Sequence, residues 1–167
     1  MEGDNPRSTA KVGGHPLHPL LIPFPIVSFI GAFVTDVMWM TGREEGWATA
    51  SNWLLGVGLA TALLAAITGF IDYLGDERVR RIGAASRHMI ANLAVVVLET
   101  VNIILRLAGG HERIGGAGIW LSALSVAILA YSGWLGGELV YRHGIGVRTP
   151  DAAPVPGRDR KFSRDRR

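Results

Sequence analysis

Histidine is the residue type in this chain with the clearest capacity for cofactor chemistry. Four of the five histidines, His15, His18, His88 and His143, stand at the ends of apolar segments. A neutral imidazole nitrogen binds haem iron and most transition-metal ions. The sequence has no cysteine, which excludes thiolate metal sites, disulfides and cysteine nucleophiles. We therefore expect these four histidines to be the candidate ligands, and His111, in a glycine-rich turn, to be solvated.

Charged side chains accompany the histidines at the same segment ends. Arg87 precedes His88, and Arg142 precedes His143. A guanidinium group forms paired hydrogen bonds with a carboxylate, so we expect the two arginines to contact the propionates of a haem. Further candidates at these ends are Tyr141, as a cofactor contact, and Asp72 and Glu138, as hydrogen-bond partners of the imidazoles.

A row of polar residues also runs through the third apolar segment: His88, Asn92, Glu99, Asn102 and Arg106. Steps of three, four or seven residues place them on one helical face. Glu99 falls about 16 Å along the helix from His88, near the middle of a membrane. A carboxyl group at that depth is expected to face the bundle interior and to have a partner. Its role stays open between a functional group and a structural clamp in which Asn92 and Asn102 act as donors.

Four long apolar segments must position these side chains. They cover about residues 17–40, 52–71, 89–105 and 119–137, and Asp36 is the only charge in the first. About 20 apolar residues span the bilayer core, and two of the segments carry no charge at all. A surface helix of a soluble protein needs a polar face. The sequence therefore predicts an all-α, four-helix transmembrane bundle.

The basic residues predict how this bundle is oriented. With four spans, the N-terminus, the second loop and the C-terminus share one side, which holds fourteen Lys and Arg residues. The other side holds three, Arg43, Arg106 and Arg113. Cytoplasmic segments are enriched in these residues, so we expect a multi-pass protein of the inner (plasma) membrane with both termini cytoplasmic. The same parity brings His15, His18, His88 and His143 to the cytoplasmic end, where we expect a histidine cluster.

Both terminal segments of the chain are expected to lack a fixed structure. Residues 1–14 form a polar N-terminal segment, residues 15–148 form the bundle, and residues 149–167 form a basic tail that we expect to be disordered. The tail is a topology determinant and a contact for the lipid bilayer. No aromatic platform accompanies its charges, so nucleic acid is not expected as a partner. Gly133 and Gly137 form a Gly-x-x-x-Gly pair, which is compatible with a homo-oligomer.

Two motifs resemble a known family. They are His15-Pro16-Leu17-His18-Pro19 and Gly137-Glu138-Leu139-Val140-Tyr141-Arg142-His143-Gly144. Together with four spans, they resemble the small prokaryotic membrane proteins of domain of unknown function 2231, over about residues 13 to 148. In that family the domain is sometimes joined to a Rieske-type iron–sulfur module. The resemblance thus implies an electron-transfer context, with a separate iron–sulfur protein as the redox partner.

Three functions are compatible with this sequence. The first is electron transfer with haem b, or a single transition-metal ion, held by the histidine cluster. The second is transport or proton relay that uses Glu99 and Asp36. The third is a non-catalytic accessory or assembly subunit without a cofactor. No hydrolase or transferase motif is present, so enzymatic activity, if any, would be redox chemistry.

Overall fold

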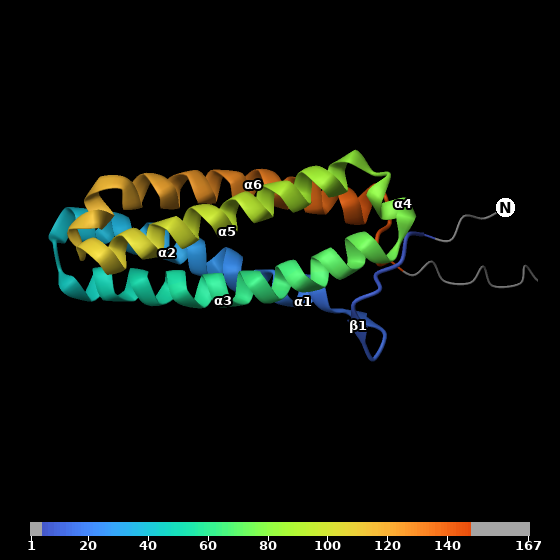
Figure 1. Ribbon diagram of the computed structural model, residues 1–167, viewed down its shortest axis with the longest axis horizontal. Helices are drawn as coiled ribbons and strands as arrows, with labels where there is room; N and C mark the ends of the chain where they lie inside the picture. The colour runs from blue at the N-terminus through green and yellow to red at the C-terminus, as the bar shows by residue number, and fades with distance from the viewer. Residues whose placement is uncertain (1–4, 148–167) are drawn as a thin grey trace, which may run out of the picture.

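A computed structural model describes residues 5–147 as a bundle of four long helices that run antiparallel to their neighbours (Figure 1). The first span consists of α1 (Leu17–Leu21) and α2 (Pro23–Gly42). The other three are α3 (Glu45–Gly75), α5 (Gly83–Gly109) and α6 (Ile119–Tyr141). Each of the four spans is long and apolar enough to cross a membrane. This confirms the predicted architecture, although the helices extend beyond the apolar segments at most of their ends.

The proline-rich entry to the first span is already helical at Leu17. Helix α1 contains Pro19, and a single residue, Ile22, separates it from Pro23 at the start of α2. Proline fits the first turn of a helix because the amide groups there have no intrahelical acceptor. The first span thus consists of a five-residue helix, which contains His18, and a 20-residue helix.

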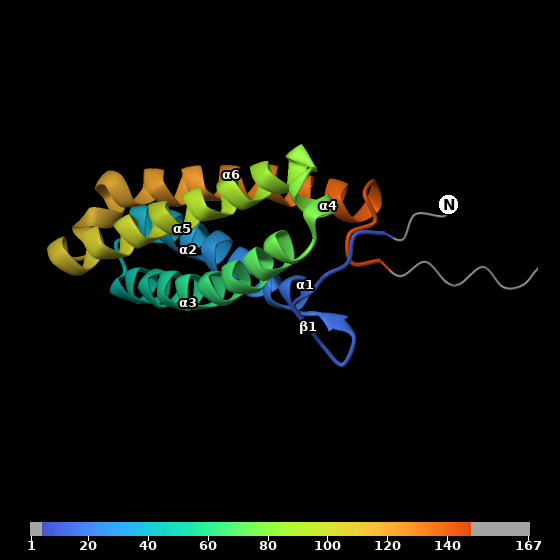
Figure 2. The same cartoon turned by 45° about the vertical axis from the view of Figure 1, so that its right-hand side comes forward.

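Short elements connect the long helices. A hairpin of β1 (Lys11–Val12) and β2 (His15–Pro16) precedes α1, and its turn uses Gly13 and Gly14 at positive φ. Helix α4 (Glu77–Arg80) joins α3 to α5, and a π-helical turn, η1 (Ile114–Gly118), leads into α6. The hairpin, α4 and both ends of the described chain lie at one end of the bundle, which we call the terminal end (Figure 2).

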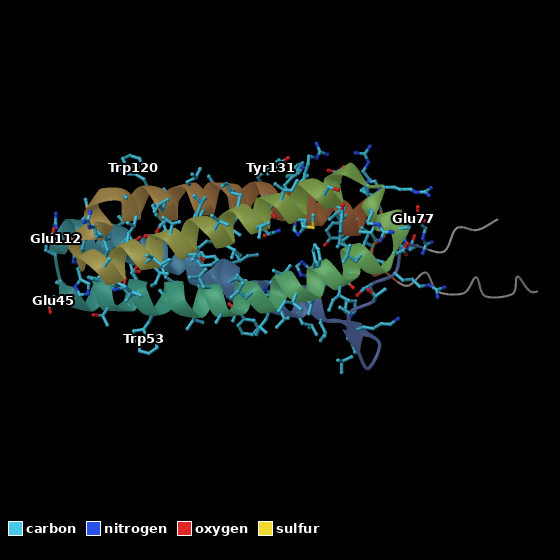
Figure 3. The ribbon with its side chains drawn as sticks, viewed as in Figure 1. Glu45, Trp53, Glu77, Glu112, Trp120 and Tyr131 are labelled. Atoms are coloured by element: carbon cyan, nitrogen blue, oxygen red, sulfur yellow. The ribbon has the colours of Figure 1, made fainter. Side chains whose placement is uncertain are left out.

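The distribution of polarity is inverted relative to a soluble protein. Large apolar side chains cover the outside, and Trp120 and Trp134 are 75% and 78% exposed. Trp53 and Trp120 point away from opposite sides of the bundle, and the acidic residues Glu45, Glu77 and Glu112 lie at its two ends (Figure 3). The interior instead holds a set of fully buried polar residues: Asp36, Ser51, Glu99, Asn102, Ser122 and Ser125. An apolar outside around a polar interior suits a protein whose solvent is lipid.

The N-terminal segment, which we expect to be mobile, is tied to the bundle from residue 5 onward. The Asp72 carboxylate, near the end of α3, accepts hydrogen bonds from the amides of Thr9 and Ala10, each 2.7 Å long, and from the Ser8 hydroxyl at 2.9 Å. The Gly146 amide donates to the Pro6 carbonyl, so residues 5–10, which we call the strap, also contact the chain beyond α6. Asp72 thus holds this strap instead of a histidine. The basic tail, residues 149–167, lies outside the described residues.

Candidate functional site

Two of the predicted ligands, His18 and His88, face each other inside the terminal half of the bundle. Their ring centres are 6.1 Å apart, and the ring planes are nearly perpendicular, at 84°. His18 comes from α1 and His88 from the second turn of α5, so two different spans supply the two imidazoles. The sequence predicts His88 with His143, and His15 or His18 as alternatives; the structure places His18 beside His88.

Main-chain carbonyl groups fix both rings. The Nδ1 of His18 lies 2.8 Å from the Ala65 carbonyl oxygen on α3, and the Nδ1 of His88 lies 2.9 Å from the Ser132 carbonyl oxygen on α6. A carbonyl oxygen only accepts, so each Nδ1 carries the hydrogen and each Nε2 presents its lone pair. The Asn92 amide donates to His88 Nε2 at 3.1 Å, which agrees with this tautomer. A hydrogen bond from Nδ1 is the usual way in which a protein orients a ligating imidazole.

Two glycines make room for these imidazoles. A Cβ atom at Gly69 of α3 would lie 2.9 Å from His18 Nδ1, and one at Gly136 of α6 would lie 3.3 Å from His88 Cε1. The same atom at Gly133 or Gly137 would meet nothing within 4 Å. The Gly-x-x-x-Gly pair therefore lies on open surface, and the glycine that permits close packing in α6 is Gly136. Helices α3 and α6 are thus shaped around the two rings.

The remaining predicted ligands are placed elsewhere at the terminal end. His15 lies in β2, and His143 follows α6, where its Nε2 is 4.0 Å from a Glu138 carboxylate oxygen. Within residues 5–147, no group of three or more His, Asp or Glu side chains is arranged to hold a metal ion. A shared four-histidine metal site is therefore not supported in the described chain, whereas the proximity of His143 to Glu138 agrees with the proposed carboxylate partner.

The other residues expected to contact a cofactor lie at the surface. Arg87 and Arg142 line a cavity together with His143, and neither His18 nor His88 borders it. The Tyr141 side chain is 92% exposed. Contact of Arg87, Arg142 and Tyr141 with a haem therefore stays a prediction. The positions of His18 and His88 give it no support.

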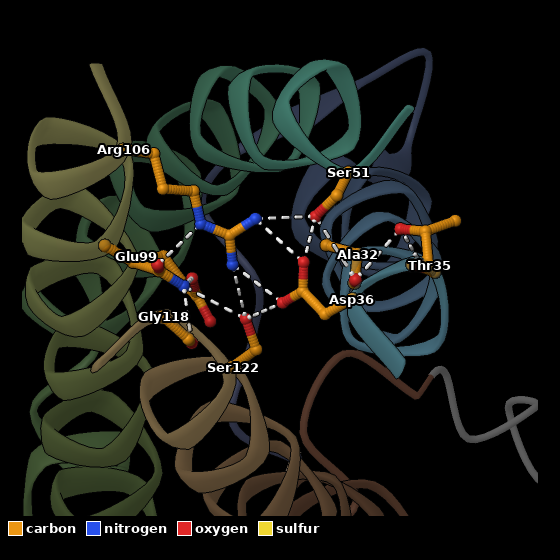
Figure 4. A network of polar contacts seen from close by, with 10 residues as sticks. Ala32, Thr35, Asp36, Ser51, Glu99, Arg106, Gly118 and Ser122 are labelled. Carbon is orange, nitrogen blue, oxygen red and sulfur yellow. Dashed lines mark hydrogen bonds and ion pairs between the residues drawn. The ribbon is translucent and has the colours of Figure 1, made fainter. Parts of the chain in front are cut away.

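A second polar layer lies in the opposite half of the bundle, and Figure 4 shows its network of polar contacts. Its centre is a fully buried ion pair: Arg106 Nη1 and Nη2 donate to the two Asp36 carboxylate oxygens at 2.8 and 2.7 Å. The hydroxyl groups of Ser51 and Ser122 donate to the same carboxylate at 2.5 and 2.8 Å. Since these residues come from α2, α5, α3 and α6, one network links all four spans.

Glu99 borders this network, and its predicted burial and partner are confirmed. Its Oε2 accepts from Asn102 Nδ2 at 2.9 Å, and Asn102 Oδ1 accepts from Arg106 Nε at 2.8 Å. The second predicted donor, Asn92, instead donates to the Ser132 hydroxyl at 2.7 Å, since it lies two turns closer to His88. The network therefore favours the clamp role for Glu99. Of the two amides predicted as donors to it, only Asn102 donates.

Sequence reasoning placed Arg106 on the inward polar stripe but missed its pairing with Asp36. The topology argument counted Arg106 among the charges outside the membrane, whereas the residue is 2% exposed inside the bundle. Its place in the stripe, one turn beyond Asn102, was the signal for this burial. Ser51 and Ser122 gave no signal of their own, because single serines are common in membrane helices.

An apolar layer separates the two polar ones. It consists of Phe29, Ala32, Leu55, Ala62, Val95 and Leu129, all buried. Val95 lies on α5 between Asn92 and Glu99, so the polar stripe of α5 is interrupted there. The bundle interior thus has a histidine layer, an apolar layer and an ion-pair layer.

Comparison with known proteins agrees with this architecture. A family model described as a predicted membrane protein matches residues 14–149, which include all four spans and both polar layers. No curated protein and no solved structure matches the chain.

Proposed function

The chain belongs to the membrane protein family of domain of unknown function 2231 (DUF2231), and we propose that it carries electrons through a haem b held between His18 and His88. The observation that carries the proposal is the pair of facing imidazoles, each with its Nδ1 bound to a main-chain carbonyl of another helix. In that arrangement neither Nε2 carries the hydrogen, so the two spans could each supply a ligand once Asn92 releases His88 Nε2. Four-helix bundles commonly build cofactor sites in this way.

The two imidazoles are close enough to hold one group together, because their ring centres are 6.1 Å apart. His18 and His88 would each contribute its Nε2 to the iron of a bound haem. Asn92 is the donor that must leave His88 Nε2, and it retains shorter bonds to Ser132 Oγ and the His88 carbonyl, at 2.7 and 2.8 Å.

Two imidazoles favour a haem over a lone metal ion. A structural or catalytic transition-metal ion takes three or four protein ligands. A haem brings ring nitrogens of its own, so two imidazoles of the protein would be enough to hold it. When bound, a haem supplies one-electron exchange between ferric and ferrous iron. The chain contributes the fixed orientation of His18 and His88 and the apolar layer that lies on the inner side of them.

The apolar layer also bears on the alternative of a transport or proton-relay protein. Such a role needs polar groups that follow one another across the membrane. Here Val95 and Leu129 stand between the His88 layer and the Glu99 layer. This favours an electron carrier, or a cofactor-free accessory subunit, over a conducting path. A separate iron–sulfur protein as redox partner, and assembly of several copies, remain part of the proposal on the grounds of the resemblance alone.

We also propose the inner membrane as the location, with both termini cytoplasmic. Of the ten Lys and Arg residues in the described part of the chain, seven lie at the terminal end. Burial of Arg106 removes one charge from the opposite side and so strengthens the asymmetry. Reporter fusions after Gly46 and Gly110 should report the outside, and a fusion after Arg81 the cytoplasm. The reverse pattern would overturn the orientation and leave the haem proposal untouched.

Absorption spectroscopy tests the haem proposal. The full chain, expressed with added iron and haem precursor and purified in detergent, should show a Soret band and sharp bands on reduction. His18→Ala and His88→Ala should each lose this spectrum while the protein still inserts. His15→Ala and His111→Ala are matched controls and should retain it. A colourless wild type, or unchanged haem content in both ligand variants, would overturn the proposal in favour of the accessory subunit.

A further inference from the structure

A basic cavity lies at the terminal end, between the start of α5 and the end of α6. Its volume is about 380 Å³, within the usual range for a small-ligand site. Three arginines line it, Arg81, Arg87 and Arg142, together with Glu138 and His143. We propose that this cavity binds the phosphate group of an anionic phospholipid from the surrounding bilayer. The proposal is independent of the haem site, because neither facing imidazole borders the cavity.

The charge balance of the cavity favours an anion. Arg81 is paired with Glu77 at 2.7 Å, and Arg142 is paired with Glu138 at 3.3 Å. Among the described residues, Arg87 has no acidic partner, although it lines the same cavity. The cavity therefore has one more positive charge than the local acids neutralise. A phosphate would supply the missing negative charge and accept paired hydrogen bonds from guanidinium groups.

The position of the cavity identifies the source of the phosphate. Its lining residues on this side, Arg81 to Arg87, belong to the end of the charged connection through α4 and to the start of α5, which is the level of lipid headgroups. Next to it, exposed apolar side chains continue toward the middle of the membrane. Ile90 and Leu93 on α5 are 62% and 59% exposed, and Trp134 on α6 is 78% exposed. A lipid whose phosphate sits at Arg87 can lay its acyl chains along this surface, whereas free phosphate gains nothing from it.

The first turn of α5 shapes the rest of the cavity. Gly83, the first residue of α5, lines it, and a Cβ atom there would meet nothing within 4 Å. No side chain caps the start of this 27-residue helix. The amide groups of the turn therefore add to the positive potential that the arginines provide.

Lipid binding to the purified full chain tests the proposal. In detergent, the protein is titrated with phosphatidylglycerol, with phosphatidylcholine of the same acyl chains, and with inorganic phosphate. Phosphatidylglycerol should bind in preference to the other two probes. Arg87→Gln should weaken it about fivefold, since one arginine near a membrane surface contributes about 1 kcal/mol. Arg43→Gln, at the opposite end, is the matched control and should change nothing.

Three outcomes would overturn the proposal. Equal affinity for the two lipids would mean that the headgroup charge is not recognised. Equal competition by inorganic phosphate would assign the cavity to a free anion. A loss of haem in Arg87→Gln with unchanged lipid affinity would instead assign Arg87 to the haem propionates. Retention of the native fold in Arg87→Gln is checked by its helical circular dichroism, and Arg87→Lys should recover part of the lipid affinity because it keeps the charge.

Discussion

The buried ion pair between Asp36 and Arg106 makes the sharpest prediction about stability. Replacement of Arg106 by Met leaves the Asp36 carboxylate in the interior with two serine donors and no cation. It also removes the donor to Asn102 Oδ1. Removal of one partner of a buried pair costs about 3–5 kcal/mol. That is a large part of the roughly 5–15 kcal/mol by which a typical domain is stable.

The double variant Asp36→Leu/Arg106→Met gives the second half of this prediction. Removal of both charges leaves no uncompensated ion, and replacement of buried pairs by apolar residues is often neutral or stabilising by about 1–4 kcal/mol. The double variant should therefore be more stable than Arg106→Met alone. Unfolding of the detergent-solubilised protein, followed by far-ultraviolet circular dichroism against increasing denaturant, measures both free energies.

An exposed ion pair at the same end of the bundle is the control. Arg43 contacts Glu112 at 3.0 Å, and their side chains are 54% and 83% exposed. Because solvent screens such a pair, Arg43→Gln should cost less than about 1 kcal/mol. The reasoning is refuted if Arg106→Met costs no more than this control, or if the double variant is destabilised by the sum of its two single changes.

Three further predictions concern the terminal end. Gly69→Ala places a methyl group against the His18 ring and should destabilise the protein by about 1–3 kcal/mol, whereas Gly133→Ala, on open surface, should be neutral or slightly stabilising in the same unfolding assay. Asp72→Ala releases the strap of residues 5–10, so limited proteolysis there should be at least about tenfold faster, while equal rates would contradict the anchoring role. The Arg78 guanidinium beside Asp76 holds the pKa of that carboxyl well below its usual value of 3.8. The stability that ionised Asp76 contributes is therefore present above pH 3.8 and is lost as the pH falls through the lowered pKa. Asp76→Asn should therefore reduce acid sensitivity below about pH 4, by less than about 1 kcal/mol because solvent screens the pair at Arg78, whose side chain is 48% exposed. An unchanged acid profile would argue against this prediction.

The sequence alone determined the number of spans and the face of α5 that points inward. Both depend on local quantities: the length of an apolar segment and the 3.6-residue period of a helix. These quantities also placed Glu99 and Asn102 inside the bundle, where the structure has them. The shared terminal end of His18 and His88 follows from helix parity in the same way.

Only the tertiary structure decided which polar groups meet. Asp36 and Arg106 are 70 residues apart, and their contact depends on how α2 and α5 are rotated and offset along their axes. The pairing of His88 with His18, and the use of Asp72 to hold the N-terminal strap, have the same origin. The period of a helix shows which of its faces points inward. Side-chain packing between helices decides which residues on those faces meet, and distant residues such as Gly69 and Gly136 contribute by leaving space for the two imidazoles.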